Sequence, residues 1–417
     1  VRLLANPEEE RFSGVKHDHG FPALSAEAMQ RTLRELGKSG ADICAFVGSF
    51  DYLRFASSWA EHCSHDFPAN LPALRDEAAQ DFMDVGAIVD APAKLSEALG
   101  LDRRLTLHGL AHHLNHAWGS YALSPFYRDQ DDGPVMVLVT DGMGDDTAIS
   151  SFVFQRGKER IEVRDVSPPK SLFDSLGLVY QVLSSTQAGW TPLSSEGRYM
   201  GAAAWGDGER KTNPYYEALR PLLLLEANGV VRVNPRYANW HKDPVRAYAP
   251  ALERVLGPPI PRSEFWNPDV VLDVEHDHAS KTERRLDRAR LDRAAADQLV
   301  FEDAVVHLTQ HLIDVSGSHK LIWTGGSALN CTTSAHLLAH FDHAYFAERF
   351  PHQPARTLHL WVPPFPGDAG VAAGAAIHLA LGCGVPLDVT PLNHAFYCGA
   401  PPRAREVKAA LDETLES

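Results

Sequence analysis

The strongest constraint on the fold is a pattern that occurs three times: an apolar run of strand length ends in a short turn that contains acidic residues or glycine. Residues 134–140 (PVMVLVT) end in the carboxylate-rich turn 141–146. Residues 320–324 end in a Gly-Gly turn and residues 358–362 in a Pro-Gly-Asp turn, and helical sequence follows both. Strands that alternate with helices in this way indicate an α/β fold. Because ligands of open α/β sheets bind at strand ends, we expect the functional groups in these turns.

The spacing of apolar residues predicts further elements on both sides of these turns. Helices are expected near residues 24–39, 109–122, 171–187, 196–204, 286–316, 327–340 and 370–382, and strands near 43–47, 105–107, 148–155 and 160–165. Residues 208–280 are polar and rich in proline, and we expect few regular elements there. The complete pattern predicts two α/β lobes.

Composition and charge exclude several classes of function. Of 417 residues, 39 are Lys or Arg and 54 are Asp or Glu, so the net charge is −15 at pH 7. Nucleic-acid-binding surfaces depend on clustered cations, so no nucleic-acid partner is expected. No window approaches the roughly 18 apolar residues of a bilayer span, and the first residues lack the apolar stretch of a signal peptide. We therefore expect a cytoplasmic enzyme without membrane contact, whose five cysteines are reduced and mostly buried.

A His-x-x-x-His pair is the strongest chemical signal. His112 and His116 lie four positions apart in predicted helical sequence, so both imidazoles share one face and can bind the same ion. Asp141 after a strand and Asp368 in the Pro-Gly-Asp turn supply carboxylates, although each alone also fits a turn or helix cap. Such a set suits Fe²⁺, Mn²⁺ or Zn²⁺. We predict one divalent ion at these four residues, with Fe²⁺ expected, and we expect His113 to face solvent or lie behind the ligands.

Glycine-bearing turns predict a phosphate site. The segment Gly325-Gly326-Ser327 follows a strand and opens a helix, where backbone N–H groups can hold phosphate. Other residues expected to line the same cleft are Ser175, Gly177, Glu196 and Arg198. Close backbone packing is the alternative reason for each glycine. No GxxxxGK[ST] or GxGxxG motif occurs, so neither a Walker nor a Rossmann nucleotide site is indicated.

Read together, these motifs resemble those of the nodulation- and antibiotic-type carbamoyltransferases, the family that includes the tobramycin, cephalosporin and ansamycin carbamoyltransferases. The matching stretches are PEEERFSGVKHDHGFP (7–22), AHHLNHAWGSYALSPF (111–126), VMVLVTDGMGD (135–145), SLGLVY (175–180), EGRYMGAAAWG (196–206), WTGGSALN (323–330) and PPFPGDAGVAAGAA (363–376). Their order and spacing extend through almost the whole chain, and the combination is far more specific than any single motif.

For the fold, the resemblance implies an actin/Hsp70-like double lobe, akin to the tRNA threonylcarbamoyl-transfer protein, with two βαβ-type subdomains around a central cleft. Residues 1–165 are then expected to form the first lobe, without its initial strand. Residues 166–385 are expected to form the second lobe, with an insertion at about 208–280. Residues 386–417 are expected to lead into a C-terminal YrdC-like domain that lies beyond this sequence.

For the activity, the resemblance implies transfer of a carbamoyl group from carbamoyl adenylate, made from ATP and carbamoyl phosphate, to a hydroxyl or amine of a small natural product. The metal-binding residues of the family fall on the four residues already proposed. Its GG(x)ALN motif falls on Gly325, Gly326 and Asn330, which implies contacts with the adenylate phosphates and ribose. Arg198 stands where the family often has lysine, so the charge is kept while the hydrogen-bond geometry changes.

The acceptor needs a base to take its proton, and the sequence leaves its identity open. The candidates are His113, His17 and Asp145. Aromatic residues of the 208–280 segment are expected either to form a lid that faces the acceptor or to pack the segment down, namely Tyr215, Tyr216, Trp240 and Trp266.

Three other functions remain alternatives at this stage. A small-molecule kinase of the same double-lobed superfamily would transfer phosphate and release ADP. A metal-dependent hydrolase is disfavoured because His113 occupies the position of the glutamate in HExxH, and no GxSxG motif indicates a nucleophilic serine. A nucleotide-binding subunit without chemistry of its own would bind ATP without turnover.

Overall fold

The structure is a computed structural model. It describes residues 10–14, 23–51, 54–55, 85–129, 133–157, 160–190, 196–243, 245–261, 263, 288–353 and 356–385. His17, Trp266 and the expected linker 386–417 lie outside the described residues.

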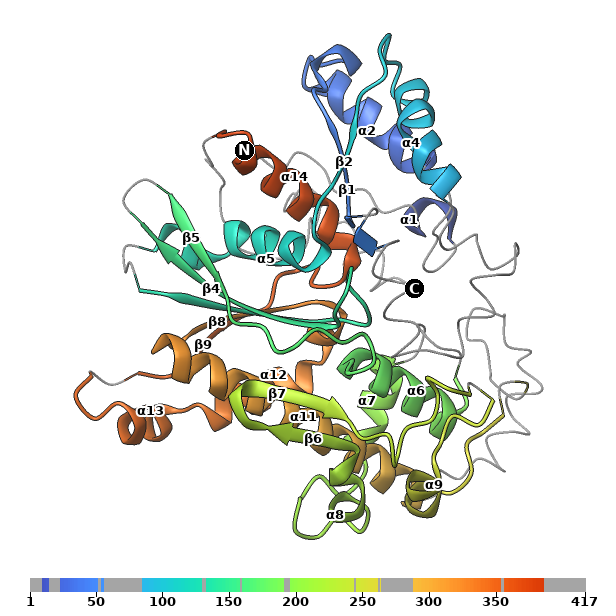
Figure 1. The fold of residues 1–417 in the computed structure, drawn as a ribbon, viewed down its shortest axis with the longest axis vertical. Helices are drawn as coiled ribbons and strands as arrows, with labels where there is room; N and C mark the ends of the chain where they lie inside the picture. Colours follow the sequence, from blue (N-terminus) through green and yellow to red (C-terminus); the bar gives the residue numbers. More distant parts are fainter. Residues whose placement is uncertain are drawn as a thin grey trace, which may run out of the picture.

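A five-stranded sheet of order β5-β4-β3-β8-β9 forms the centre of the molecule (Figure 1). Strands β3 (Val135–Thr140), β4 (Ile149–Arg156) and β5 (Ile161–Asp165) form an antiparallel meander. Strands β8 (Lys320–Thr324) and β9 (His359–Trp361) continue the sheet parallel to β3. The α/β class is therefore confirmed. This sheet contains strands from both sides of residue 165, and the expected lobe boundaries stay a prediction.

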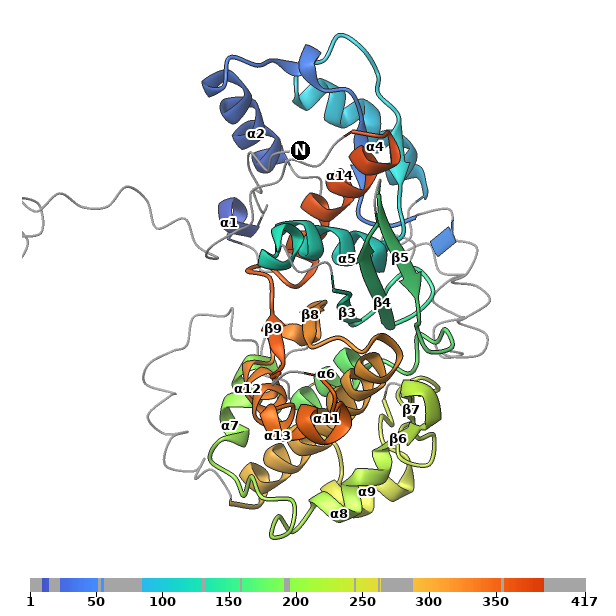
Figure 2. The same cartoon turned by 90° about the vertical axis from the view of Figure 1, so that its left-hand side faces the viewer.

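Helices cover both faces of this sheet (Figure 2). Helices α5 (His112–Leu123) and α14 (Val371–Gly382) lie on one face, where Val135, Val137 and Val139 of β3 pack. Helices α11 (Arg288–Ser316) and α12 (Cys331–His340) lie on the other, where Met136 and Leu138 pack. Burial on both faces explains why β3 is a continuous apolar run instead of an alternating one.

The segment expected to hold few regular elements is ordered where the structure describes it, and this expectation was wrong. It contains α8 (Tyr216–Leu219), β6 (Leu223–Glu226), β7 (Val230–Val233) and α9 (Pro250–Leu256). Tyr216 and Trp240 are buried in the core beside α11, and Tyr215 packs against it, so these three aromatics anchor the segment and form no lid. Three further helices contribute residues to the same apolar core: α6 (Leu176–Ala188), α7 (Glu196–Ala203) and α13 (His343–Arg349).

A smaller unit precedes the sheet. It contains α1 (Glu10–Ser13), α2 (Ala23–Glu35), β1 (Phe46–Gly48), α4 (Val85–Ala98) and β2 (Leu107–Gly109). β1 and β2 pair in parallel, and a separate apolar cluster lies beneath them. Loops with 3₁₀ geometry span Gly40–Asp42, Pro125–Arg128, Arg220–Leu222, Ala227–Gly229, Gly326–Leu329 and Asp368–Gly370.

Two further expectations concern the cysteines and membrane-spanning helices. Cys44, Cys331 and Cys383 are free thiols, as expected, but all three are exposed and not buried. Among the described helices, none combines the length and the apolar character that a bilayer span needs.

Glycines allow α5 and α14 to touch backbone to backbone. A Cβ added at Gly374 would lie 1.9 Å from the carbonyl oxygen of Asn115, and one added at Gly119 would lie 2.7 Å from the Cα of Gly374. The turn Asp368–Gly370 leads directly into α14. The close approach of the two helices therefore fixes where Asp368 lies relative to α5.

We predict that Gly374→Ala lowers the free energy of unfolding by about 1–3 kcal/mol, because the new methyl group forces the helices apart. The matched control is Gly382→Ala in the same helix, where an added Cβ meets nothing within 4 Å. Urea denaturation of both variants measures the effect. Equal stability of the two variants would contradict the close packing.

A buried carboxyl joins α7 to α11. The Tyr199 hydroxyl donates a hydrogen bond to Oδ2 of Asp297, while Oδ1 is buried and makes no hydrogen bond in the described structure. Burial raises the pKa of Asp297 to about 7, and Tyr199 and Arg293 only partly oppose this effect. Since its ordinary pKa is 3.8, the unfolded chain loses this proton first as the pH rises. Asp297 therefore makes folding less favourable as the pH rises from about 4 to 7.

We predict that Asp297→Asn reduces the fall in melting temperature between pH 5 and pH 8, because the amide does not ionise. Tyr199→Phe should do the opposite and steepen the fall, since it removes the donor that stabilises the carboxylate. Differential scanning calorimetry at the two pH values compares the variants with the wild type. Parallel pH profiles for all three proteins would refute the assignment.

Candidate metal centre

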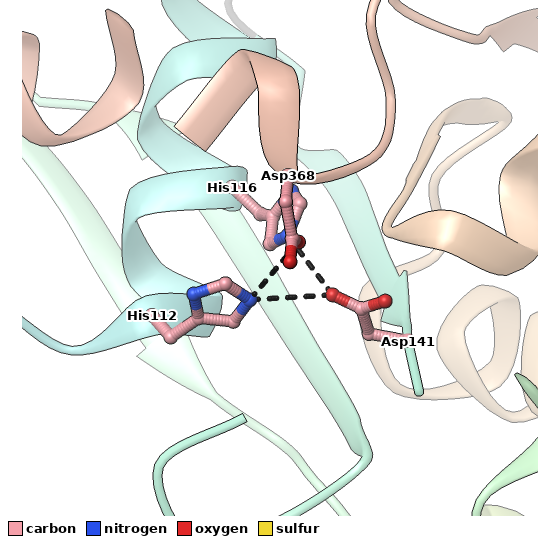
Figure 3. A group of neighbouring side chains, drawn as sticks. All are labelled: His112, His116, Asp141 and Asp368. Atoms are coloured by element: carbon pink, nitrogen blue, oxygen red, sulfur yellow. Dashed lines mark hydrogen bonds and ion pairs between the residues drawn. The ribbon is translucent and has the colours of Figure 1, made fainter. Parts of the chain in front are cut away.

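Four side chains from three distant parts of the chain meet at the end of β3. His112 and His116 project from one face of α5, Asp141 follows β3, and Asp368 begins the turn before α14 (Figure 3). One potential ligand atom from each residue lies within 4.8 Å of the others. The predicted convergence of these four residues is thus confirmed, and they form a possible metal-binding group.

The distances within the group are short and nearly equal. Oδ2 of Asp141 lies 3.3 Å from Nε2 of His112 and 3.1 Å from Nε2 of His116. Oδ1 of Asp368 lies 3.4 Å from both of these nitrogens. Each imidazole therefore faces both carboxylates, as a shared cation between them would require.

Burial differs sharply among the four. The side chains of His112 and His116 are 0% and 1% exposed and that of Asp141 is 10% exposed, whereas that of Asp368 is 68% exposed. The group is therefore closed on three sides, and a ligand from solvent reaches it on the side of Asp368.

The two oxygens of Asp141 have separate partners. Oδ1 accepts hydrogen bonds from the backbone N–H of Gly142 at 2.7 Å and of Gly326 at 3.1 Å. Oδ2 faces the two imidazoles. Because β3 and β8 are parallel neighbours, their following turns lie side by side, and Gly326 reaches Asp141 for this reason. The two backbone N–H groups thus orient the carboxylate.

The electrostatics of the group favour a positive charge at its centre. Burial lowers the pKa of His112, but hydrogen bonds to Asp141 and Asp368 outweigh it and raise this pKa to about 10. The same two carboxylates outweigh burial at His116 and raise its pKa. Conversely, burial raises the pKa of Asp141, but the two imidazoles hold it well below its ordinary value. Two anionic and two neutral donors in this arrangement fit a divalent cation in place of two protons.

The contacts of His113 and Asp145 favour structural roles over the proposed role as base. His113 is buried, which agrees with the second expected position, behind the ligands, and its Nδ1 lies 2.7 Å from the Ser150 hydroxyl. Burial and the charge of His112 lower the pKa of His113 to about 3. Asp145 uses both oxygens to accept backbone N–H groups, from Asp51 at 2.9 Å and His112 at 2.6 Å. The third candidate base, His17, lies outside the described residues.

The glycine-bearing motifs hold the turns together. Gly325 has φ +90°, and an added Cβ would lie 2.3 Å from the Thr140 carbonyl oxygen. The Gly325 N–H donates to the carbonyl oxygen of Pro366 at 2.8 Å, which joins the turn after β8 to the turn that contains Asp368. An added Cβ at Gly177 would meet the Asp141 carbonyl at 3.0 Å. Close backbone packing, the alternative reason for these glycines, is therefore present.

The remaining candidate nucleotide-binding residues lie on helices around the same region. Ser175 caps α6 by accepting from the Leu178 N–H, and its hydroxyl donates to the carbonyl oxygens of Asp141 and Gly142. Asn330 caps α12 and exchanges hydrogen bonds with the amide of Gln298. Glu196 and Arg198 lie on α7, where Arg198 is exposed. The structure brings Ser175 and Gly326 to the metal-binding group, and contacts of all these residues with nucleotide stay a prediction.

Sequence reasoning missed the residues that support His112. The Ser49 carbonyl oxygen lies 3.0 Å from Nδ1 of His112, and the Phe50 ring stacks on the imidazole. Their separation of about 60 positions from His112 leaves no local spacing that would have indicated the contact. The strand predicted at residues 43–47 ends just before Ser49 and gave no sign that this segment reaches His112.

A family model described as "Carbamoyltransferase N-terminus" matches residues 91–377, which include all four residues of the group. The chain is 25% identical over 381 residues to the protein sll1178 of Synechocystis sp., which covers 90% of this chain and 53% of that protein. It is 27% identical over 387 residues to the nodulation protein NolNO of Sinorhizobium fredii, covering 91% of this chain and 45% of NolNO.

The chain spans about half the length of the curated relatives that it matches. The family match, in contrast, covers more than half of the chain and contains the sheet, helix α5 with its two histidines and the strand-end turns. The chain therefore belongs to the family of carbamoyltransferase N-terminal domains.

Proposed function

We propose that this chain contains the transfer site of an ATP-dependent carbamoyltransferase. In this proposal, the carbamoyl group of carbamoyl adenylate, made from carbamoyl phosphate and ATP, passes to a hydroxyl or amine of a small natural product. The observation that carries the proposal is the group of two histidines and two aspartates within 4.8 Å, in a chain that belongs to this family.

His112, His116, Asp141 and Asp368 would hold the divalent ion, for which we propose Fe²⁺ ahead of Mn²⁺ or Zn²⁺. A bound divalent ion would supply positive charge for oxygen atoms of the adenylate during transfer. Asp141 contributes orientation, because two backbone N–H groups fix one of its oxygens. Asp368 faces solvent and marks the side on which the adenylate and the acceptor would enter.

During transfer, an acceptor oxygen or nitrogen would form a bond to the carbamoyl carbon, and the bond from that carbon to the phosphate oxygen would break to release AMP. The proton of the acceptor must go to a base. We keep His17 as the proposed base, because His113 and Asp145 are committed to contacts within the protein. For the nucleotide, we propose contacts from Arg198, Glu196 and the turn after β8, which lies beside Asp141.

Two further parts of the proposal concern the whole protein. The sheet order, an antiparallel meander followed by two parallel strands, supports an actin/Hsp70-like double lobe, whose other lobe would contain β1 and β2. We also propose that the whole protein contains a YrdC-like domain that makes the adenylate; the relatives are about twice as long as the stretch that this chain matches. We further propose a cytoplasmic location and no nucleic-acid partner, in accord with the net charge of −15.

We predict that the wild-type chain binds one equivalent of divalent metal and that His116→Ala and Asp368→Ala each lose it. The loss should exceed the roughly 10- to 100-fold weakening that follows removal of an outer hydrogen-bond partner, because a direct ligand is removed. Metal content by inductively coupled plasma mass spectrometry is measured beside carbamoyl transfer and AMP release by the full-length protein. The control is His108→Ala, whose exposed histidine lies outside the group.

Full transfer activity in the metal-free variants would refute the proposed role of the group. Release of ADP without AMP would instead identify the small-molecule kinase, and tight ATP binding without turnover would identify a subunit without chemistry.

We also predict that His17→Gln lowers kcat by about 100-fold or more while the metal content stays unchanged, as expected for loss of a general base. Steady-state kinetics of the full-length protein with saturating ATP and carbamoyl phosphate test this. An unchanged kcat would remove His17 from the proposal and leave the metal site intact.

A further inference from the structure

His112 is held by a segment that is distant in sequence and that belongs to the smaller N-terminal unit. Three consecutive residues that follow β1, Ser49 to Asp51, contact it directly or through one side chain. The Ser49 carbonyl oxygen lies 3.0 Å from Nδ1 of His112. A carbonyl oxygen can only accept, so Nδ1 carries the hydrogen and Nε2 is the nitrogen that faces the carboxylates.

The Phe50 side chain fixes the plane of the imidazole. Its ring lies 4.0 Å from the His112 ring, measured between centroids, with an angle of 14° between the planes. Phe55 packs against the outer side of Phe50 with centroids 5.4 Å apart. The imidazole of His112 in turn meets His116 edge to face at 4.8 Å. A rotation of His112 would therefore disturb the second imidazole as well.

The third contact fixes the backbone of His112. The Asp51 N–H donates to Oδ1 of Asp145, and Oδ2 of the same carboxylate accepts from the His112 N–H. Asp145 thus joins the segment to the first turn of α5, where N–H groups lack partners within the helix. The backbone of His112 is therefore restrained by Asp145, and its ring is restrained by the Ser49 carbonyl oxygen and by the Phe50 ring.

Asn115 ties this segment to the opposite side of the site. Its Nδ2 donates to the Ser49 carbonyl oxygen at 3.2 Å, and its Oδ1 lies 3.0 Å from Nδ1 of His378 on α14. Asn115 is fully buried. Helix α5, which carries both histidines, and helix α14, which follows the turn with Asp368, are therefore both connected to residues 49–51.

We propose that residues 49–51 position His112 for metal binding, with Phe50 as the positioning residue, so that the metal affinity depends on how the N-terminal unit docks against α5. The proposal rests on the proposed metal site. By linkage, the dependence is reciprocal: a bound ion would stabilise the docked segment by the amount that docking strengthens metal binding.

The test compares Phe50→Leu with Phe50→Tyr. Leucine keeps apolar bulk but loses the flat ring, whereas tyrosine keeps the stacked ring. We expect Phe50→Leu to weaken Mn²⁺ binding by about 10- to 100-fold and Phe50→Tyr to retain wild-type affinity, both measured by competition with a chromophoric chelator. Phe12→Leu, at an exposed phenylalanine of α1, makes the same substitution outside residues 49–51 and should leave the affinity unchanged.

A second measurement tests whether a bound ion stabilises the docked segment. In hydrogen exchange of the wild-type chain, added Mn²⁺ should slow exchange of the Asp51 amide, which donates to Asp145, and this protection should be lost in Phe50→Leu. Wild-type Mn²⁺ affinity in Phe50→Leu would overturn the positioning role alone. Absence of Mn²⁺ binding by the wild type, under conditions in which it is folded, would overturn the metal site itself.

Discussion

The site depends on the fact that the two oxygens of the Asp141 carboxylate have different partners. One oxygen accepts backbone N–H groups from the turns after β3 and β8, and the other faces both imidazoles of α5. The first set of contacts requires that two parallel strands end side by side, which the sheet order provides. These contacts place the negative charge of the carboxylate where two neutral nitrogen donors could share a cation with it.

Glycine packing links the other ligands to this anion. Contact between the backbones of α5 and α14 at Gly119 and Gly374 brings the turn with Asp368 to the histidine face of α5. The Gly325 N–H joins the turn after β8 to the same Pro-Gly-Asp turn. The turns after β3, β8 and β9 are therefore held together by backbone contacts. Even a methyl group at Gly325 or Gly374 would separate parts that must touch.

The sequence predicted the strands of the sheet, most of its helices and the four residues of the metal-binding group. The elements and the histidine pair rest on local spacing, and the two aspartates rest on their positions in turns after strands. Apolar runs mark buried strands, and a four-residue interval places His112 and His116 on one face. The roles of Asp145 and His113 could not be predicted, because their partners at Asp51 and Ser150 lie far away in sequence. The segment 208–280 was misjudged because its helices and strands are too short for a clear period, and buried Tyr216 and Trp240 hold them in place.

Anomalous diffraction from crystals grown with Mn²⁺ tests the central claim most directly. The account predicts one strong peak bounded by Nε2 of His112, Nε2 of His116, Oδ2 of Asp141 and Oδ1 of Asp368, within coordination distance of all four. It also predicts that the Oδ1 contacts of Asp141 with Gly142 and Gly326 persist beside the ion. A peak bound to surface carboxylates only, or well-ordered density for water alone among the four side chains, would contradict the account.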